Sequence, residues 1–69
     1  MKEIQFCKNL KALRVSKNLG QKQLAELLLT TVKTISHWET GYSEPSIEQL
    51  CALAKLFDVT LDDLVWGGG

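Results

Sequence analysis

Residues 21–41, QKQLAELLLTTVKTISHWETG, carry apolar side chains at two successive sets of helical spacing. The first set comprises Leu24, Ala25 and Leu28, and the second comprises Ile35 and Trp38. Apolar residues three or four positions apart lie on one face of an α-helix, where they can pack against a neighbouring helix. The stretch therefore predicts two short helices that are joined by a tight turn and packed together through these faces.

The outer face of the second helix is left with a strip of small polar, cationic and methyl-bearing side chains. Its members are Val32, Lys33, Ser36, His37 and Thr40. The major groove of DNA displays hydrogen-bond donors, acceptors and thymine methyl groups, and these side chain types can contact all three. The strip thus indicates a helix that reads base edges, whereas Trp38 shares the packing face with Ile35 and is expected in the core.

The order of residues in and around this stretch resembles the helix-turn-helix family of phage lambda-type repressors, Cro proteins and their bacterial relatives, the XRE family. The resemblance is carried by Gln21, Leu24, Ala25, Thr31, Thr34, Ile35, Ser36, Trp38, Glu39, Gly41, Pro45 and Ser46. It extends from about Phe6 to Val65. It implies an all-α fold, a compact five-helix bundle of the lambda-repressor type, with one DNA-binding domain over residues 1–66 and a flexible glycine tail at 67–69.

Periodicity and capping residues place the ends of the helices. The first three are expected from about Glu3 to Lys17, from Gln21 after a weak N-cap at Gly20, and from the N-cap Thr31 to a left-handed stop at Gly41. The last two helices are expected to begin where capping-box spacing occurs, at Ser46 with Gln49 and at Thr60 with Asp63. Their buried stripes are expected to be Ile47, Leu50, Leu53, Ala54 and Phe57 in the fourth helix, and Leu61 and Leu64 in the fifth.

Leu29 departs from the family pattern, which most often has glycine at the first residue of the turn between the second and third helices. A leucine that keeps a left-handed conformation costs on the order of 1 to 2 kcal/mol. Two alternatives follow from this departure. Either the turn differs slightly from that of the family, or the bundle tolerates the strain.

The resemblance assigns DNA contacts to individual residues. Base contacts are implied for Val32, Lys33, Ser36 and His37, and phosphate contacts for Gln21, Thr31, Arg14, Thr40, Tyr42 and Ser43. Lys33 can donate to guanine, and Val32 can contact a thymine methyl group. The family often has lysine or arginine where Tyr42 and Ser43 stand, which predicts weaker affinity and a shallower salt dependence than in a more basic relative. Arg14 and Glu39 resemble an ion pair that links the first helix to the third.

The formal net charge is zero, which is unusual for a protein held on DNA by bulk charge. The charges are nevertheless divided along the chain: residues 1–33 hold seven basic and two acidic residues, and residues 34–69 hold one basic and six acidic residues. Because salt screens charges beyond about 8 Å in cells, a local positive face can attract phosphate on a neutral molecule. The chance scatter of charges over solvated helices is the alternative explanation.

Other features exclude several classes of protein. Cys7 and Cys51 belong to no metal-binding cluster and have the spacing of small buried residues. No membrane span or signal peptide is indicated, so the cytoplasm is the expected location. The single histidine, His37, shares no helical face with both Ser36 and Glu39, so a catalytic triad and an enzyme are not expected. The sequence indicates no cofactor, no metal and no small-molecule effector.

A homodimer on a palindromic operator is expected, with Val65 and Trp66 as the candidate dimer contacts, because a large indole at the end of a terminal helix marks a partner surface when it is exposed. In the alternative, Trp66 folds back over its own core. We expect a repressor of transcription, because no activating surface is evident. The competing hypothesis, which the neutral charge favours, is a protein-interaction module such as an antitoxin-like or adaptor protein.

Overall fold

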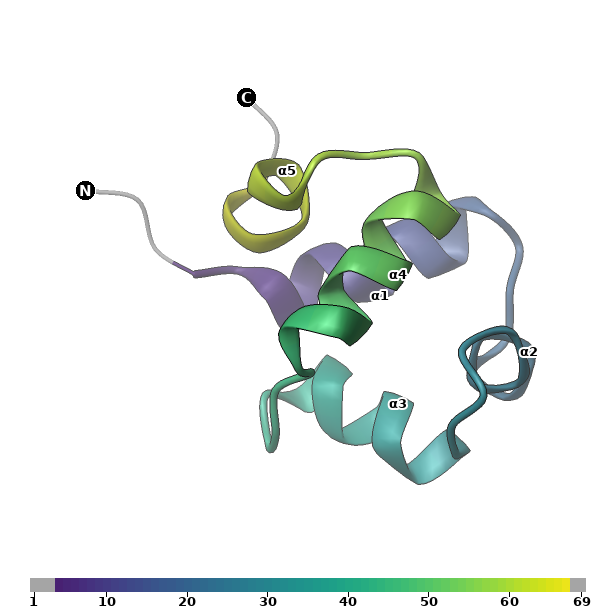
Figure 1. Ribbon diagram of the computed structural model, residues 1–69. Coiled ribbons are helices and arrows are strands. Elements are labelled where there is room, and N and C mark those ends of the chain that lie inside the picture. The colour runs from purple at the N-terminus through teal and green to yellow at the C-terminus, as the bar shows by residue number, and fades with distance from the viewer. Residues whose placement is uncertain (1–3, 68–69) are drawn as a thin grey trace.

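The computed structural model describes residues 4–67, and this part of the chain folds into helices joined by short loops. The helices are α1 (Phe6–Ser16), α2 (Gln21–Leu27), α3 (Val32–Thr40), α4 (Ile47–Phe57) and α5 (Leu61–Trp66). In Figure 1, α4 crosses in front of α1, α3 lies along the lower edge of the bundle, and α5 lies at the upper left. The all-α five-helix fold is therefore confirmed.

The core draws apolar side chains from all five helices. Its fully buried members are Leu10, Leu24, Ile35, Leu53 and Leu64, and the other buried residues are Phe6, Ala25, Trp38, Ala54 and Phe57. Helices α2 and α3 contact each other, and α1 contacts both α3 and α5. The faces expected to join the second and third helices are thus buried, and the expectation that Trp38 is a core residue is confirmed.

Capping contacts begin and end the helices close to the expected positions. The Thr31 hydroxyl accepts a hydrogen bond from the Thr34 amide at 3.1 Å. At the start of α4, the Ser46 hydroxyl accepts from the Gln49 amide at 3.2 Å while the Gln49 side chain accepts from the Ser46 amide at 2.8 Å, which completes the capping box. Gly41 ends α3 with a φ of 81°, a left-handed conformation that glycine adopts at little cost.

Three expectations about helix ends and burial were wrong. The first helix begins at Phe6, not near Glu3, which lies outside the described residues. Ile47 and Leu61 are 76% and 44% exposed, and each is the first residue of its helix, at the end of the predicted apolar stripe. Cys51 is also exposed, whereas Cys7 is half-buried.

Leu29 keeps the left-handed conformation that the family usually assigns to glycine. Its φ is 56°, and its side chain is 94% exposed. An exposed leucine gains little from packing, so nothing at this position compensates for the clash between the side chain and its own backbone. The turn therefore retains the family's geometry, and the bundle tolerates the strain.

Replacing Leu29 by glycine is expected to raise the free energy of unfolding by about 0.5 to 1 kcal/mol, since relief of strain exceeds the extra entropy of the unfolded glycine chain. Thermal unfolding, followed by circular dichroism, measures the change. The matched control is Leu27→Gly, which removes another exposed leucine from the last position of α2 and should destabilise the protein by about 0.5 to 1 kcal/mol. A Leu29→Gly variant that unfolds at a lower temperature would contradict the strain argument.

Candidate nucleic-acid interface

Helix α3 separates its buried face from its outer face. Ile35 and Trp38 are buried, whereas Val32, Lys33 and Thr40 are exposed and Ser36 and His37 are half-buried. The strip expected from the sequence is thus accessible along the length of α3. The single carboxylate of this helix, Glu39, turns inward, so no acidic side chain of α3 interrupts the strip.

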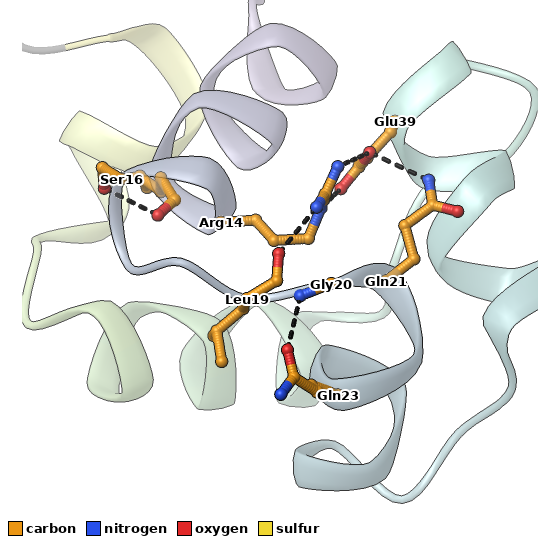
Figure 2. Close-up of polar contacts among 8 residues, drawn as sticks. Arg14, Ser16, Leu19, Gly20, Gln21, Gln23 and Glu39 are labelled. Carbon is orange, nitrogen blue, oxygen red and sulfur yellow. Dashed lines mark hydrogen bonds and ion pairs between the residues drawn. The ribbon is translucent and has the colours of Figure 1, made fainter.

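An ion pair joins the first helix to the third. The Arg14 Nε donates to one carboxylate oxygen of Glu39 at 2.6 Å, and its Nη2 donates to the other at 3.1 Å, so the contact is bidentate (Figure 2). The side chains of Arg14 and Glu39 are only 12% and 4% exposed. Two parallel hydrogen bonds between charged groups away from water fix both position and orientation. The pair that the family resemblance implied is therefore present.

Two further contacts extend this ion pair into a network. The side-chain amide of Gln21 donates to the Glu39 carboxylate at 3.1 Å, and the Arg14 Nη1 donates to the Leu19 carbonyl at 2.7 Å (Figure 2). Glu39 thereby connects the last turn of α3 with α1 and with the first residue of α2, while Arg14 also holds the loop between them. Neither contact could be predicted from the sequence, because both depend on how the helices pack. Together these bonds fix α3 relative to its two neighbours.

The electrostatics of the pair follow from its hydrogen bonds. The hydrogen bonds that Arg14 donates to the Glu39 carboxylate raise the pKa of Arg14 above its ordinary value, against the opposing effect of burial. A basic group with a raised folded-state pKa contributes stability that is fully present below its ordinary value and is lost only above it. The contribution of Arg14 is therefore constant throughout the physiological pH range.

The loop after α3 folds back onto His37. The His37 carbonyl accepts hydrogen bonds from the amides of Tyr42 at 2.9 Å and Ser43 at 3.3 Å and from the Thr40 hydroxyl at 3.3 Å. The rings of His37 and Tyr42 pack together with their centroids 4.5 Å apart and their planes at 43°. The sequence did not reveal this aromatic pair, because the two residues are brought together by the left-handed turn at Gly41.

The remaining candidate phosphate contacts are placed differently. Thr31 is exposed, but its hydroxyl already caps α3 and bonds the Thr34 hydroxyl at 2.9 Å. Arg14 directs three of its donors to Glu39 and Leu19, so little of the guanidinium is left for a phosphate. Lys17, Lys22 and Lys33 are exposed, and within residues 4–67 none of them forms a salt bridge.

The candidate dimer contacts lie at the other edge of the bundle, at the end of α5 (Figure 1). Val65 and Trp66 are both half-buried. The Val65 carbonyl accepts from the Gln5 amide at 2.9 Å, so the N-terminal segment runs beside α5. Val65 also borders a pocket of about 280 Å³ whose apolar lining includes Ile4 and Leu50.

The part of the chain that the structure describes holds neither a metal-binding cluster nor a membrane-spanning helix. No group of three or more histidine, cysteine, aspartate or glutamate side chains in this part of the chain is arranged to hold a metal ion. None of the helices described here has both the length and the apolar character needed to cross a membrane.

Comparison with known proteins gives a consistent picture. Residues 10–64 match the model of a helix-turn-helix family. The chain is 44% identical over 64 residues to the HTH-type transcriptional activator BcrR of Enterococcus faecalis, covering 93% of this chain and 31% of BcrR. It is 43% identical over 53 residues to the HTH-type transcriptional regulator AnsR of Bacillus subtilis, covering 77% of this chain and 46% of AnsR. The chain thus spans less than half the length of these two relatives.

A solved structure supports the same family at the level of the fold. The P22 c2 repressor, in complex with a synthetic operator, superimposes with a TM-score of 0.85 at 28% identity, covering 91% of this chain and 96% of that structure. The two relatives named above are both regulators of transcription, which is the class that the sequence led us to expect. The chain therefore belongs to the lambda-repressor-like helix-turn-helix family of transcriptional regulators.

Proposed function

We propose that this chain binds double-stranded DNA in a sequence-specific manner, with α3 in the major groove. The observation that carries the proposal is the accessible strip on α3, which lies on a helix that Glu39 braces against α1 and α2. A recognition helix must hold its side chains in register with the bases, and fixed packing against neighbouring helices meets that need. The P22 c2 repressor, with which the chain shares its fold, is bound to an operator.

In this proposal the base contacts come from the outer strip of α3. Lys33 donates to guanine, Val32 packs against a thymine methyl group, and Ser36 and His37 bond to polar base edges. The phosphate contacts come from amide or hydroxyl groups of residues at helix ends or in the loop after α3. These residues are Gln21, Thr31, Thr40, Tyr42 and Ser43. Arg14 contributes by bracing α3, since most of its donors are already occupied.

A dimer on a palindromic operator is the second part of the proposal. Recognition helices of paired helix-turn-helix proteins lie about 34 Å apart, which is one turn of DNA. The longest dimension of this bundle is 33 Å, so a separation of that order is within reach of two adjoining copies. Val65 and Trp66 are the proposed contacts, and each retains part of its surface in the single chain. Occupation of DNA that polymerase needs makes repression the simplest outcome of such binding.

Titration against genomic duplex fragments at two salt concentrations tests the proposal. The exposed lysines Lys17 and Lys22 form no salt bridge among residues 4–67, and we place them on phosphates in this proposal. Two such contacts predict a loss of affinity of about tenfold between roughly 50 and 200 mM salt. The protein should keep fragments of one sequence bound in the presence of competitor DNA, because base contacts add sequence preference to the phosphate contacts. Binding that is absent or independent of salt contradicts the proposal and favours the protein-interaction module.

The same fragments test the dimer and the direction of regulation. Light scattering of the complex at micromolar concentration should give the mass of two chains on one palindromic duplex. A single chain per duplex, with monomer mass in free solution, would remove the dimer from the proposal. Repression is measured with a reporter whose promoter overlaps the retained fragment, and increased expression would contradict it.

A further inference from the structure

The pair formed by His37 and Tyr42 links the candidate recognition strip to the loop that follows it. The ring centroids lie 4.5 Å apart at an interplanar angle of 43°, which is within the range of favourable aromatic packing. The backbone closes the same unit, because the amide of Tyr42 donates to the His37 carbonyl at 2.9 Å. Two residues five positions apart are thus held together by both ring and backbone contacts.

We propose that Tyr42 is a positioning residue that presets the His37 imidazole for one base pair of the operator. This inference rests on the proposed DNA-binding function, and it gives Tyr42 a second role in addition to its proposed phosphate contact. The tyrosine ring is 79% exposed and contributes nothing to the buried core, so a structural role in folding does not account for it. Its position beside His37 leaves the imidazole as the group on which it acts.

The effect follows from the freedom of the histidine side chain. A half-buried histidine on the outside of a helix can adopt more than one side chain conformation, and fixing it on binding costs entropy. A ring in contact with the imidazole restricts these conformations before DNA arrives. Among residues 4–67 neither imidazole nitrogen takes part in a hydrogen bond, since only the His37 carbonyl does, so the ring nitrogens are left to bond to a base. Tyr42 thereby lowers the cost of ordering His37.

The aromatic ring, and not the phenol hydroxyl, is the group that this role requires. Tyr42→Phe keeps the ring and removes the hydroxyl, whereas Tyr42→Ala removes both. The two variants therefore separate positioning from a phosphate contact, because a hydroxyl bonded to phosphate is lost equally in both. Neither variant alters a buried side chain, so both are expected to unfold at nearly the wild-type temperature.

The first test uses the free protein and does not depend on DNA. The tyrosine ring current should shift the NMR signals of the His37 ring protons in the wild type and in Tyr42→Phe, and the shift should disappear in Tyr42→Ala. Cross-relaxation between the two rings should be visible in the wild type. Identical His37 signals in all three proteins would overturn the inference while leaving the proposed DNA binding untouched.

The second test measures sequence preference on a set of operators varied one base pair at a time. The base pair read by His37 is the one at which His37→Ala loses preference. Tyr42→Ala should reduce preference at that base pair by about three- to tenfold, which corresponds to the entropy of one ordered side chain. Tyr42→Phe should retain it. If Tyr42→Ala and Tyr42→Phe weaken binding equally for all operators, the positioning role is overturned and only the phosphate contact of Tyr42 remains. If the wild type binds no operator, the proposed function itself is refuted.

Discussion

Replacing Glu39 by alanine is expected to lower the free energy of unfolding by about 3 kcal/mol or more. Removing one partner of a buried ion pair costs about 3 to 5 kcal/mol, because it leaves the other charge without its counter-charge in a site that water hardly reaches. Here the orphaned groups are the Arg14 guanidinium, whose side chain is 12% exposed, and the Gln21 amide. In a domain of this size, each kcal/mol corresponds to about 4–8 °C in melting temperature, so the fall is on the order of 12 °C or more.

Chemical denaturation of wild type and variant measures the loss, and the exposed Glu26 on α2 supplies the matched control. Glu26→Ala removes the same side chain without breaking a hydrogen-bond network and should change stability by less than about 0.5 kcal/mol. Glu39→Gln, which keeps the size of the side chain and one acceptor oxygen, should fall between wild type and Glu39→Ala. Equal stabilities for Glu39→Ala and Glu26→Ala would show that the ion pair contributes nothing.

Glu39→Ala is also expected to weaken DNA binding at temperatures at which the variant is fully folded. The glutamate contacts α1 and the first residue of α2, so its loss frees the last turn of α3 to move relative to both. A recognition helix that moves must be ordered again on DNA, and that ordering reduces affinity. Full retention of wild-type affinity in the folded variant would limit the pair to a role in stability.

The fold was predictable because it rests on periodic burial. The spacing of Leu24, Ala25, Ile35 and Trp38 identifies two packed helical faces, and all four residues are buried. Periodicity fails at the ends of helices, where a residue has the right spacing but no neighbouring element to cover it. Ile47 shows this failure, since it completes the apolar stripe of α4 in the sequence and is 76% exposed in the structure.

The candidate site was only partly predictable, for a different reason. Spacing along one helix places Val32, Lys33 and His37 on an outer face, but it says nothing about contacts between elements. The hydrogen bond from Gln21 to Glu39 joins residues 18 apart in the sequence, and the contact between the rings of His37 and Tyr42 depends on the left-handed turn at Gly41. Such contacts arise from tertiary packing, so they become visible only in the structure.

The two sets of contacts both help to hold α3 in a defined arrangement, one through its backbone and the other through a side chain. The Glu39 network fixes the backbone of α3 against α1 and α2, and the Tyr42 ring limits the conformations of one side chain on it. Val32 and Lys33 lie at the start of α3, after the Thr31 cap, and no hydrogen bond or salt bridge among residues 4–67 holds their side chains. Side chains there remain adaptable, and their specificity must come from the chemistry of the contact.

Lys33→Ala is therefore expected to relax sequence preference at a single base pair of the operator. An ammonium group that donates to the O6 and N7 atoms of guanine contributes about 1 to 3 kcal/mol of discrimination, which is roughly five- to 150-fold in relative affinity. Lys33 is exposed and forms no salt bridge among residues 4–67, so its removal should leave the melting temperature nearly unchanged. Competition binding between operators that differ at one position measures the preference directly.

The matched control for Lys33 is Lys22→Ala, which removes an exposed lysine of the same charge from the adjacent helix α2. A lysine on phosphate carries no sequence information, so Lys22→Ala should weaken all operators alike and reduce the salt dependence by about one counterion. Gln21→Ala should also weaken all operators alike, but without that change in salt dependence, because the amide is uncharged. If Lys33→Ala instead weakens every operator equally and flattens the salt dependence as Lys22→Ala does, Lys33 contacts the backbone, and base recognition must lie elsewhere on α3.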